Sequence, residues 1–403
     1  MARDVLEGHP SPPPAASASA AVAWWRNPVV RGLLAQLIVL GAILALGYYL
    51  VSNLLVNLEE RRIRTGFGFL QQQAGFAIGE SVISFAPTDT YARALLVGVL
   101  NTLKVSLIGI VLATILGTVM GIARLSTNWL VAKIASAYVE ITRNIPLLLQ
   151  LFFWYTVITQ LLPDVRSALE PMPGVVLSKS GLQYPAVIYE PALLPIIIVF
   201  AVSVVAAFVY RAQMYRRQAE TGQEPKLLLP MLGIIILPAL ALHVVLGMPG
   251  ELDVPEFRTF NYRGGSSVTP EFLALLIGLS FYTGGFIAEI VRSGILGVPW
   301  GQSEASAALG LRRGLQLRLV ILPQALRIII PPTTSNYLNL TKNSSLAVAI
   351  GYPDLVSVGN TTLNQTGQAL ECIAIMMAVY LTISLLISAY MNWYNRRIAL
   401  VER

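Results

Sequence analysis

Residues 299–332, PWGQSEASAALGLRRGLQLRLVILPQALRIIIPP, form a charged amphipathic stretch between two apolar runs that are each long enough to cross a bilayer. The pattern predicts one short helix over 304–309, an interruption at Gly310, and a second short helix over 311–319 that carries three arginines. Pro323 then begins the next membrane helix, at a first-turn position where its missing N–H costs little. We expect this stretch to act as a lever in the cytoplasm, and the alternative is an ordinary cytoplasmic loop between membrane helices.

The composition predicts an all-α polytopic membrane protein. Of the 403 residues, 55% are hydrophobic and only 12% are charged, which is too little polar surface for a soluble globule of this size. The formal net charge of +7 comes from basic residues scattered over short loops rather than from a dense patch with interleaved aromatics. This distribution favours membrane orientation and argues against a nucleic-acid partner.

The residues that most enzymes and metal sites need are scarce. Cys372 is the single cysteine, which rules out an internal disulfide or a thiolate cluster, and two histidines, His9 and His243, make no credible metal site or catalytic triad. Neither glycine-rich phosphate-binding pattern, G-x-x-x-x-G-K-[ST] or G-x-G-x-x-G, occurs in the sequence. We therefore expect a non-enzymatic chain that holds no metal, no ATP and no other cofactor itself.

Eight apolar runs predict about eight transmembrane helices with both termini in the cytoplasm. Most lysines and arginines then fall on the cytoplasmic side, and Arg61, Arg62 and Arg64 are the main exception. The expected order is a disordered tail at 1–23, a first helix at 24–58, an interfacial or periplasmic segment at 59–93, a transmembrane domain at 94–395 and a cytoplasmic tail at 396–403. Within the domain, helices are expected at 94–123, 146–162, 191–210, 227–246, 271–292, 323–342 and 370–392, and the pair at 191–246 lies in an insertion over 163–270 flanked by external loops.

The predicted helix at 94–123 carries two unusual features. Its small residues recur every four positions and form a stripe on which another helix can approach closely. Lys104 lies in the same helix, where it either snorkels to the interface or faces a polar cavity. The stripe consists of Gly109, Ala113, Gly117 and Gly121.

The predicted helix at 323–342 should bend midway, because two adjacent prolines interrupt its hydrogen bonds. Its polar residues make it the first candidate for part of a translocation path. The alternative is a structural kink, in which the same polar residues satisfy broken backbone bonds. The candidate path residues are Pro331, Pro332, Asn336, Asn339 and Lys342.

The charged stretch resembles the coupling segment in the transmembrane subunits of ABC importers. Their signature is Glu-Ala-Ala, three residues, Gly, nine residues and Ile-x-Leu-Pro, and this chain departs from it at Ser306 and Val320. The resemblance implies a type I importer permease fold, in which the segment docks as a cytoplasmic coupling helix on an ATP-hydrolysing subunit. The implied coupling residues are Glu304, Ala305, Ser306, Gly310, Leu322 and Pro323.

A second string, YVEITRNIPLLLQLFF over 138–153, resembles the signature of the polar amino acid permeases in the histidine and glutamine transporter family. FIAEIVRSGI over 286–295 and KNSSL over 342–346 are similar to that family as well, and 59–90 resembles the general L-amino acid permeases. Two pairs three residues apart, Glu140 with Arg143 and Glu289 with Arg292, can each form on one helix face, the latter as a weak pair at an exposed surface. The family-motif residues are Glu140, Arg143, Pro146, Gln150, Glu289 and Arg292.

The resemblance implies an inner-membrane permease that imports polar L-amino acids with energy from ATP bound by another subunit. The implied partners are a cytoplasmic ATP-binding subunit, a second and homologous membrane permease subunit, a periplasmic amino-acid-binding protein and membrane lipid. The sequence lacks the dense intramembrane acids, bases and cation-coordinating residues that are usual in ion-driven carriers. The alternatives are an ion-driven carrier or channel that acts without an ATPase, and a membrane scaffold without transport.

Overall fold

The computed structural model describes residues 28–60, 66–188, 190–191, 193–222, 227–248 and 250–398. The chain forms two compact units, Met1–Gly66 and Phe67–Arg403. Three parts of the sequence-based prediction lie outside the described residues: the N-terminal tail at 1–23, the arginines at 61, 62 and 64, and residues 399–403 of the C-terminal tail.

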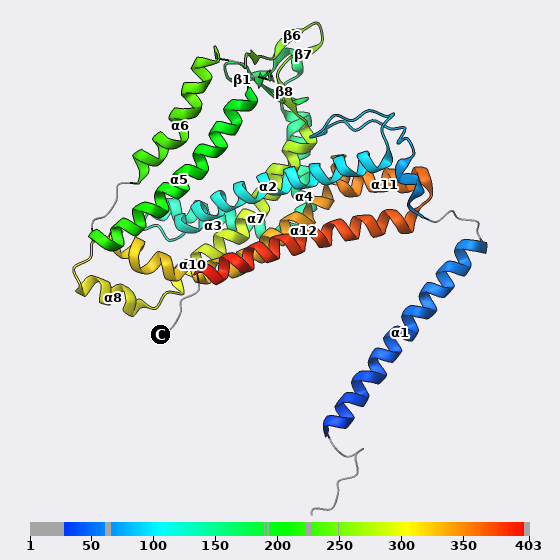
Figure 1. Ribbon diagram of the computed structural model, residues 1–403, viewed down its shortest axis with the longest axis horizontal. Coiled ribbons are helices and arrows are strands. Elements are labelled where there is room, and N and C mark those ends of the chain that lie inside the picture. The colour runs from blue at the N-terminus through cyan, green and yellow to red at the C-terminus, as the bar shows by residue number, and fades with distance from the viewer. Residues whose placement is uncertain are drawn as a thin grey trace, which may run out of the picture. The chain divides into compact units, whose positions relative to one another are not determined.

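The first unit contains one long helix, α1 (Pro28–Glu60), drawn in dark blue in Figure 1. Its 33 residues extend over roughly 50 Å at 1.5 Å per residue, which exceeds the hydrocarbon thickness of a bilayer. A helix long enough to span thus lies where the sequence predicts the first spanning helix at 24–58, with its start at residue 28 and its end at residue 60.

The predicted polytopic helical architecture is confirmed. The described residues contain seven helices long and apolar enough to cross a membrane, and eight crossings if one bent helix pair counts as a span. Besides α1, these are α2 (Tyr91–Ala123), α5 (Leu193–Thr221), α6 (Leu228–Val245), α7 (Pro270–Leu296), the segment that contains α10 (Leu322–Asn343), and α12 (Ala369–Ile398).

The bent pair lies between α2 and the inserted helices. It consists of α3 (Trp129–Asn144) and α4 (Leu147–Thr156), and α4 continues as the π-helical η3 (Val157–Leu161). The pair is bent by 108° at Pro146, which has no N–H to donate and disfavours helical geometry at the residue before it. The predicted helix at 146–162 is therefore confirmed, as the second arm of a sharp elbow.

Close packing of α2 against α7 forms the centre of the second unit. A Cβ atom on Gly117 would lie 2.6 Å from the Cβ atom of Ile287, and one on Gly121 would lie 2.6 Å from the carbonyl oxygen of Ala288. Both distances are too short for real contacts, so the two helices can approach this closely only with glycine at both positions. The predicted stripe of small residues is thus confirmed as a packing surface.

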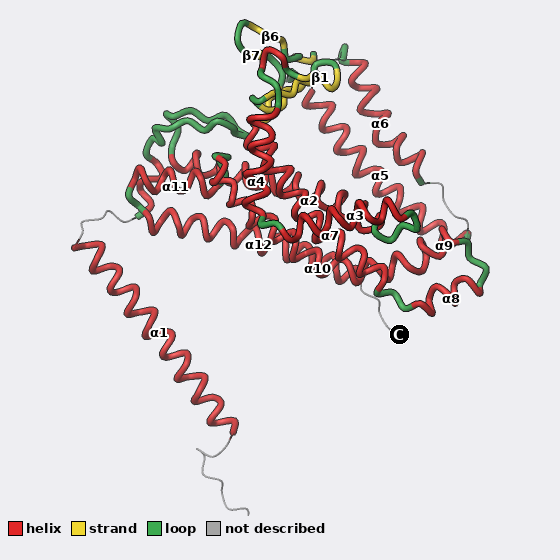
Figure 2. The backbone as a smooth tube through the Cα atoms, turned by 180° about the vertical axis from the view of Figure 1, so that it is seen from behind, coloured by secondary structure: helices red, strands yellow, loops and turns green. Residues whose placement is uncertain are grey.

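Short strands form a cap at one end of the helices, where the sequence predicts only external loops (Figure 2). One antiparallel sheet has the strand order β1-β2-β3-β8, and β4–β5 and β6–β7 form two further pairs. Runs of two to four residues are too short for an alternating pattern to stand out in a sequence. We call residues 163–188 and 250–268 the strand cap; its strands are β1 (Leu169–Met172), β2 (Val175–Ser178), β3 (Gly181–Tyr184), β4 (Ala186–Val187), β5 (Leu252–Asp253), β6 (Glu256–Arg258), β7 (Asn261–Arg263) and β8 (Ser266–Val268).

The strand cap is the place where four predicted spans begin or end. The end of η3 leads into it, α5 leaves it, α6 returns to it, and β8 passes directly into α7. The other end of α7 leads to α8 (Trp300–Ala308), α9 (Arg313–Gln316) and the π-helical η5 (Leu317–Ile321). The strand cap and α8 are therefore attached to opposite ends of one membrane-spanning helix (Figure 1).

The second unit begins with a folded segment that covers the helices. It starts with the 3₁₀-helix η2 (Phe67–Gln71) and is held to the start of α2 by a β-bridge between Gln73 and Thr90. Phe69 and Ala74 are buried in a cluster with side chains of α2, α11 (Leu355–Thr366) and α12. The stretch predicted to be interfacial or periplasmic therefore anchors Phe69 and Ala74 in the core, while most of its residues between 67 and 90 are not buried.

Candidate functional site

α8 ends in a turn that glycine makes without strain. Gly310 has a φ of +73°, its N–H donates to the carbonyl of Ala307 at 2.9 Å, and the N–H of Leu311 donates to the carbonyl of Ser306 at 3.2 Å. This pair of bonds is the Schellman arrangement that closes an α-helix. The predicted interruption at Gly310 is confirmed, and its physical role is to turn the chain from α8 towards α9.

The outer face of α8 is open to a partner. Glu304 and Ala305 are exposed, and Glu304 accepts a hydrogen bond from Trp300 Nε1 at 2.9 Å. Ser306 is buried instead, and its Oγ donates to a backbone carbonyl three residues earlier at 2.9 Å. Trp300 and Leu309 expose 76% and 80% of their surface. Large apolar side chains that are this exposed outside the spanning helices are typical of a protein contact surface.

The helical segment after Gly310 differs from the prediction. A second short helix was expected at 311–319, followed by a new helix at Pro323, but α9, η5 and α10 follow one another without a break. Leu322 is the first residue of α10 and Pro323 is the second. A π-helical turn is wider than an α-helical one, and η5 thereby makes room for the proline ring against the preceding turn.

Glu289 of α7 is the centre of a cluster that links three helices. Its carboxylate accepts hydrogen bonds from Arg292, at 2.8 Å, and from Arg124 at the end of α2, and it lies 3.7 Å from Nη1 of Arg143 on α3. The predicted pair with Arg292 is confirmed as a contact. The pair is less exposed than predicted, because the Glu289 side chain is only 26% exposed and faces three cations.

The predicted pair between Glu140 and Arg143 is not among the contacts of the described residues. Arg143 reaches instead to Glu289, and its guanidinium lies 5.3 Å from the ring centroid of Phe286. Glu140 is exposed on α3. Sequence spacing favours the local pair, but the packing of α3 against α7 brings a less exposed carboxylate within ion-pair distance of Arg143.

Gln150 explains how the chain tolerates the sharp bend at Pro146. Its side chain is buried, and Nε2 donates to the carbonyls of Thr142 and Ile145 at 2.8 and 2.9 Å. Both carbonyls lie at the end of α3, where intrahelical partners run out, and unsatisfied backbone groups are costly inside a membrane. Both motif residues, Pro146 and Gln150, therefore build the α3–α4 elbow.

The paired prolines do not interrupt α10. Pro331 and Pro332 lie inside this 22-residue helix, which continues on both sides of them, and the bend expected at this point stays a prediction. Thr333 and Thr334 donate from their hydroxyl groups to carbonyls one turn earlier, at 2.7 and 3.1 Å. These bonds add support to the backbone in a region where the prolines cannot donate.

A polar cavity of about 300 Å³ lies between α7 and α10. Three asparagines on α10, spaced by three and four residues, share the helix face that lines it. An asparagine amide can both donate and accept hydrogen bonds, so this face can bind an ammonium group and a carboxylate. The lining residues are Asn336, Asn339 and Asn343 on α10, and Tyr282, Thr283 and Phe286 on α7.

The cavity unites two of the predicted path residues, Asn336 and Asn339, and leaves out Lys342, which is exposed beside it. Sequence reasoning missed Asn343 as a lining residue, although its position four residues after Asn339 places it on the same helix face. The α7 residues carry no comparable signal, because nothing in a linear pattern says which helix faces which.

Lys104 forms an ion pair, whereas the sequence predicts that it snorkels to the interface or faces a polar cavity. Its Nζ lies 2.5 Å from Oε1 of Glu80 and 4.4 Å from the ring centroid of Phe272. Glu80 is buried and also accepts a hydrogen bond from Thr269 Oγ1 at 2.6 Å. A carboxylate from the covering segment at 67–90 thus neutralises the lysine, which makes a cation inside α2 tolerable.

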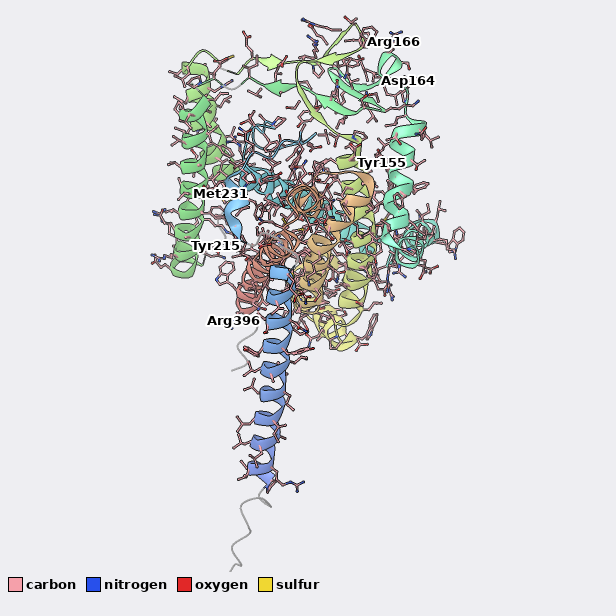
Figure 3. All side chains as sticks on the ribbon, turned by 90° about the vertical axis from the view of Figure 1, so that its right-hand side faces the viewer. Tyr155, Asp164, Arg166, Tyr215, Met231 and Arg396 are labelled. Atoms are coloured by element: carbon pink, nitrogen blue, oxygen red, sulfur yellow. The ribbon has the colours of Figure 1, made fainter. Side chains whose placement is uncertain are left out.

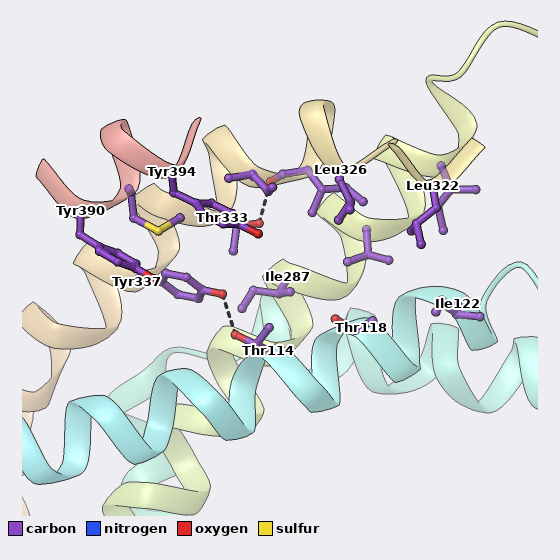
Figure 4. Close-up of a pocket in the computed structure, with 15 residues that line it drawn as sticks. Thr114, Thr118, Ile122, Ile287, Leu322, Leu326, Thr333, Tyr337, Tyr390 and Tyr394 are labelled. Atoms are coloured by element: carbon purple, nitrogen blue, oxygen red, sulfur yellow. Dashed lines mark hydrogen bonds between the residues drawn. The ribbon is translucent and has the colours of Figure 1, made fainter. Parts of the chain in front are cut away.

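A second pocket, of about 290 Å³, lies between α2, α7, α10 and α12 (Figure 4). The hydroxyl groups of Thr114 and Tyr337 form a hydrogen bond at 2.8 Å on its wall. Most other lining side chains are aliphatic or aromatic, such as Leu326 and Tyr394. This pocket therefore offers a zwitterion fewer partners than the asparagine-lined cavity does.

Most of these features lie in a part of the sequence that matches a known protein family. The sequence model of the family described as "Binding-protein-dependent transport system inner membrane component" matches residues 109–400. The matched range includes the α3–α4 elbow, the Glu289 cluster, α8 and the asparagine-lined cavity.

Three relatives align over nearly the whole chain. The "General L-amino acid transport system permease protein AapQ" of Rhizobium johnstonii is 48% identical over 377 residues, which cover 94% of either chain. The "Putative amino-acid ABC transporter permease protein YhdX" of Escherichia coli is 49% identical over 384 residues, which cover 94% of this chain and 96% of that protein. The "Glutamate/glutamine/aspartate/asparagine transport system permease protein BztB" of Rhodobacter capsulatus is 42% identical over 405 residues, which cover 93% and 95%.

Proposed function

Because this chain belongs to the family of binding-protein-dependent transport system inner membrane components, we propose that it is the permease subunit of an ATP-driven importer of polar L-amino acids. Family membership makes it a multi-pass inner-membrane component that is not itself catalytic and that works with an ATPase and a binding protein. It also bears out the resemblance to ABC importer permeases. The substrate class is supported by the names of the three relatives, each of which refers to amino acids.

The observation that carries the proposal is the exposed helix α8, which is closed at Gly310 and lies outside the spanning segments. In this proposal the exposed Glu304 and Ala305 contact the ATPase subunit, and the buried Ser306 lies on the face of α8 turned towards the permease. Leu322 and Pro323 lie where η5 passes into α10, so a displacement of the coupling segment reaches α10 through continuous helix.

The asparagine-lined cavity is the proposed part of the substrate path. Asn336, Asn339 and Asn343 offer amide donors and acceptors to the ammonium and carboxylate groups of an amino acid. The exposed Lys342 lies next to this face and attracts the carboxylate, while Pro331 and Pro332 belong to the same helix and position it.

We place both termini and α8 in the cytoplasm and the strand cap in the periplasm. The ATP-binding subunit then docks at α8, and the binding protein delivers substrate from the side of the strand cap. A second, homologous membrane subunit completes the path. Support for this last partner comes from Asn339, which is exposed although it lines the cavity, because a path needs a wall on each side.

Reconstitution tests the energy source. Proteoliposomes that contain the permease, its membrane partner and the ATPase subunit should take up labelled glutamine or glutamate when ATP is enclosed and the binding protein is added outside. The control is an ATPase variant that binds but does not hydrolyse ATP, which should abolish uptake. Uptake that persists with this variant, or that follows an ion gradient alone, would identify an ion-driven carrier and reject the proposal.

Cysteine labelling tests the orientation. Replacing the buried Cys372 by serine and adding one cysteine, either Gln302→Cys on α8 or Ser267→Cys in the strand cap, gives two single-cysteine proteins. A reagent that cannot cross the membrane should label position 267 in cells with a permeable outer membrane, and position 302 only after the inner membrane is opened. The reverse pattern would overturn the topology.

A further inference from the structure

The β6–β7 hairpin is a two-stranded projection of the strand cap. Its strands are joined by a tight turn with Thr259 at a φ of +53°, and the rings of Phe257 and Tyr262 pack across it with centroids 5.4 Å apart. At its base, a Cβ atom on Gly264 would lie 2.5 Å from Asp253 Oδ1, and one on Gly265 would lie 2.5 Å from the carbonyl oxygen of Tyr184. The glycines allow this close seating of the hairpin on the rest of the strand cap.

The tip of this hairpin has the composition of a protein contact surface. Phe260 exposes 74% of its surface, and the guanidinium of Arg166 lies 5.8 Å from its ring centroid. The strands of the hairpin also line a polar cavity of about 480 Å³, whose charged lining residues are Asp253, Glu256, Arg258 and Arg263. An exposed aromatic side chain surrounded by charged side chains is an arrangement typical of protein–protein contact surfaces.

The charges of this surface favour a protein over a membrane. Glu256 and Arg258 on the hairpin form an ion pair, with Oε2 and Nη2 3.5 Å apart, and still expose 71% and 66% of their side chains. Anionic lipid would attract the arginines but repel the interspersed acids, whereas a protein surface can present the complementary charge at each position. Figure 3 shows Asp164 and Arg166 in the cap, beyond Tyr155 at the end of α4.

The hairpin is connected to the core through the start of α7. β3 pairs with β8, and a Cβ atom on Gly181 would lie 2.1 Å from the carbonyl oxygen of Val268, so these strands are in close contact. Thr269 follows β8, caps α7 by accepting from the N–H of Phe272, and donates to Glu80. A load on the strand cap therefore acts on the helix that carries Glu289 and leads to α8.

We propose that the β6–β7 hairpin, with Phe260 as its anchor, is a docking surface for the substrate-binding protein. This inference rests on the proposed function, which places the strand cap in the periplasm. The partner is a soluble protein that presents an apolar pocket for Phe260 and a rim of mixed charges to Glu256 and Arg258. Docking here joins the binding protein to α7, whose other end leads to the coupling segment.

Stimulation of ATP hydrolysis tests the docking surface. The reconstituted complex is titrated with the binding protein that activates the unaltered complex, and Phe260→Ala should raise the half-maximal concentration about tenfold, as loss of a central aromatic anchor does. Phe208→Ala is the matched control, because Phe208 is also exposed but lies on α5 outside the strand cap. An unchanged titration with Phe260→Ala would overturn the inference.

Photocrosslinking tests the docking surface directly, without a measurement of binding affinity. A benzophenone side chain at position 260 should form an adduct with the binding protein in the active complex, and one at position 208 should not. Adducts with lipid alone at position 260, in a complex that still imports substrate, would reject the docking surface and leave the proposed function intact. Absence of ATP-driven uptake by the unaltered complex would instead reject the proposed function.

Discussion

The carboxylate of Glu289 accepts a hydrogen bond from Arg124, although the two residues lie 165 positions apart on α7 and α2. The same two helices meet through Gly117 and Gly121, where a Cβ atom would collide with α7. The helices are therefore joined twice, by close backbone packing and by a charged contact at the end of α2. If α2 and α7 rotate relative to each other, the Arg124–Glu289 contact must break, or the two side chains must move together.

Removing the carboxylate should destabilise the protein. We expect Glu289→Gln to lower the free energy of unfolding by roughly 1–3 kcal/mol, because three guanidinium groups then lose the carboxylate that they share. Thermal unfolding of the purified protein measures the effect. Glu140→Gln is the matched control and should change stability by less than about 0.5 kcal/mol, because Glu140 is exposed. Equal losses for both variants would contradict the cluster.

A side chain at Gly310 should weaken coupling. Alanine at a φ of +73° carries strain of about 1–2 kcal/mol, so Gly310→Ala should loosen the turn after α8 and reduce both ATPase assembly and binding-protein-stimulated hydrolysis. Gly301→Ala lies on the same helix, where a Cβ atom would meet nothing within 4 Å, and should be tolerated. Co-purification of the ATPase subunit with each variant measures assembly. Normal assembly and hydrolysis with Gly310→Ala would remove the coupling role from this turn.

The Lys104–Glu80 pair should show strong coupling in a double-mutant cycle. Lys104→Met leaves the buried Glu80 carboxylate without its cation, and we expect a loss of roughly 1–3 kcal/mol in unfolding free energy. The second change, Glu80→Gln, removes the stranded charge and should restore part of that loss. Additive losses across the four proteins would mean that the two residues act independently.

The asparagine face should control transport more than the neighbouring lysine does. Asn339→Leu removes an amide from the cavity wall, and we expect the concentration for half-maximal uptake to rise about tenfold. Lys342→Gln should have a smaller effect, because Lys342 is exposed beside the cavity and does not line it. Uptake of labelled glutamine into proteoliposomes gives both values. A larger effect of Lys342→Gln would move the substrate path away from the asparagines.

Asp354 should make stability depend on pH. This residue precedes α11, its carboxylate accepts from the N–H of Ser357 at 2.8 Å, and burial raises its pKa to about 6. The folded protein then holds the proton more tightly than the unfolded chain, so the stabilisation is complete below about pH 4 and is lost as the pH rises through 6. Asp354→Asn should remove the part of the pH dependence of stability that comes from this carboxylate. Melting temperatures of the two proteins, compared from about pH 4.5 to about pH 7.5, measure that difference. Parallel pH curves for the two proteins would contradict this reading.

The spanning helices could be predicted from the sequence because each is a local property of about 20 consecutive apolar residues. The runs predicted at 94–123, 271–292 and 370–392 are found as α2, α7 and α12. The turn at Gly310 and the break at Pro146 were predictable for a similar reason, since each depends on the backbone chemistry of one residue. The packing stripe on α2 follows from a simple four-residue spacing.

What only the tertiary structure decided are the partners that meet across elements. Arg143 pairs with Glu289 instead of the nearby Glu140, Lys104 pairs with Glu80, and residues of α7 complete the cavity around Asn336. In the strand cap, β3 with β8 and β4 with β5 pair across the inserted helices, so these partners lie far apart in the sequence. The runs of the cap strands are also too short to show an alternating pattern of apolar and polar residues. Helix formation depends on neighbouring residues in the sequence. These contacts depend instead on which helix faces pack together, and that packing buries surfaces from segments far apart in the chain.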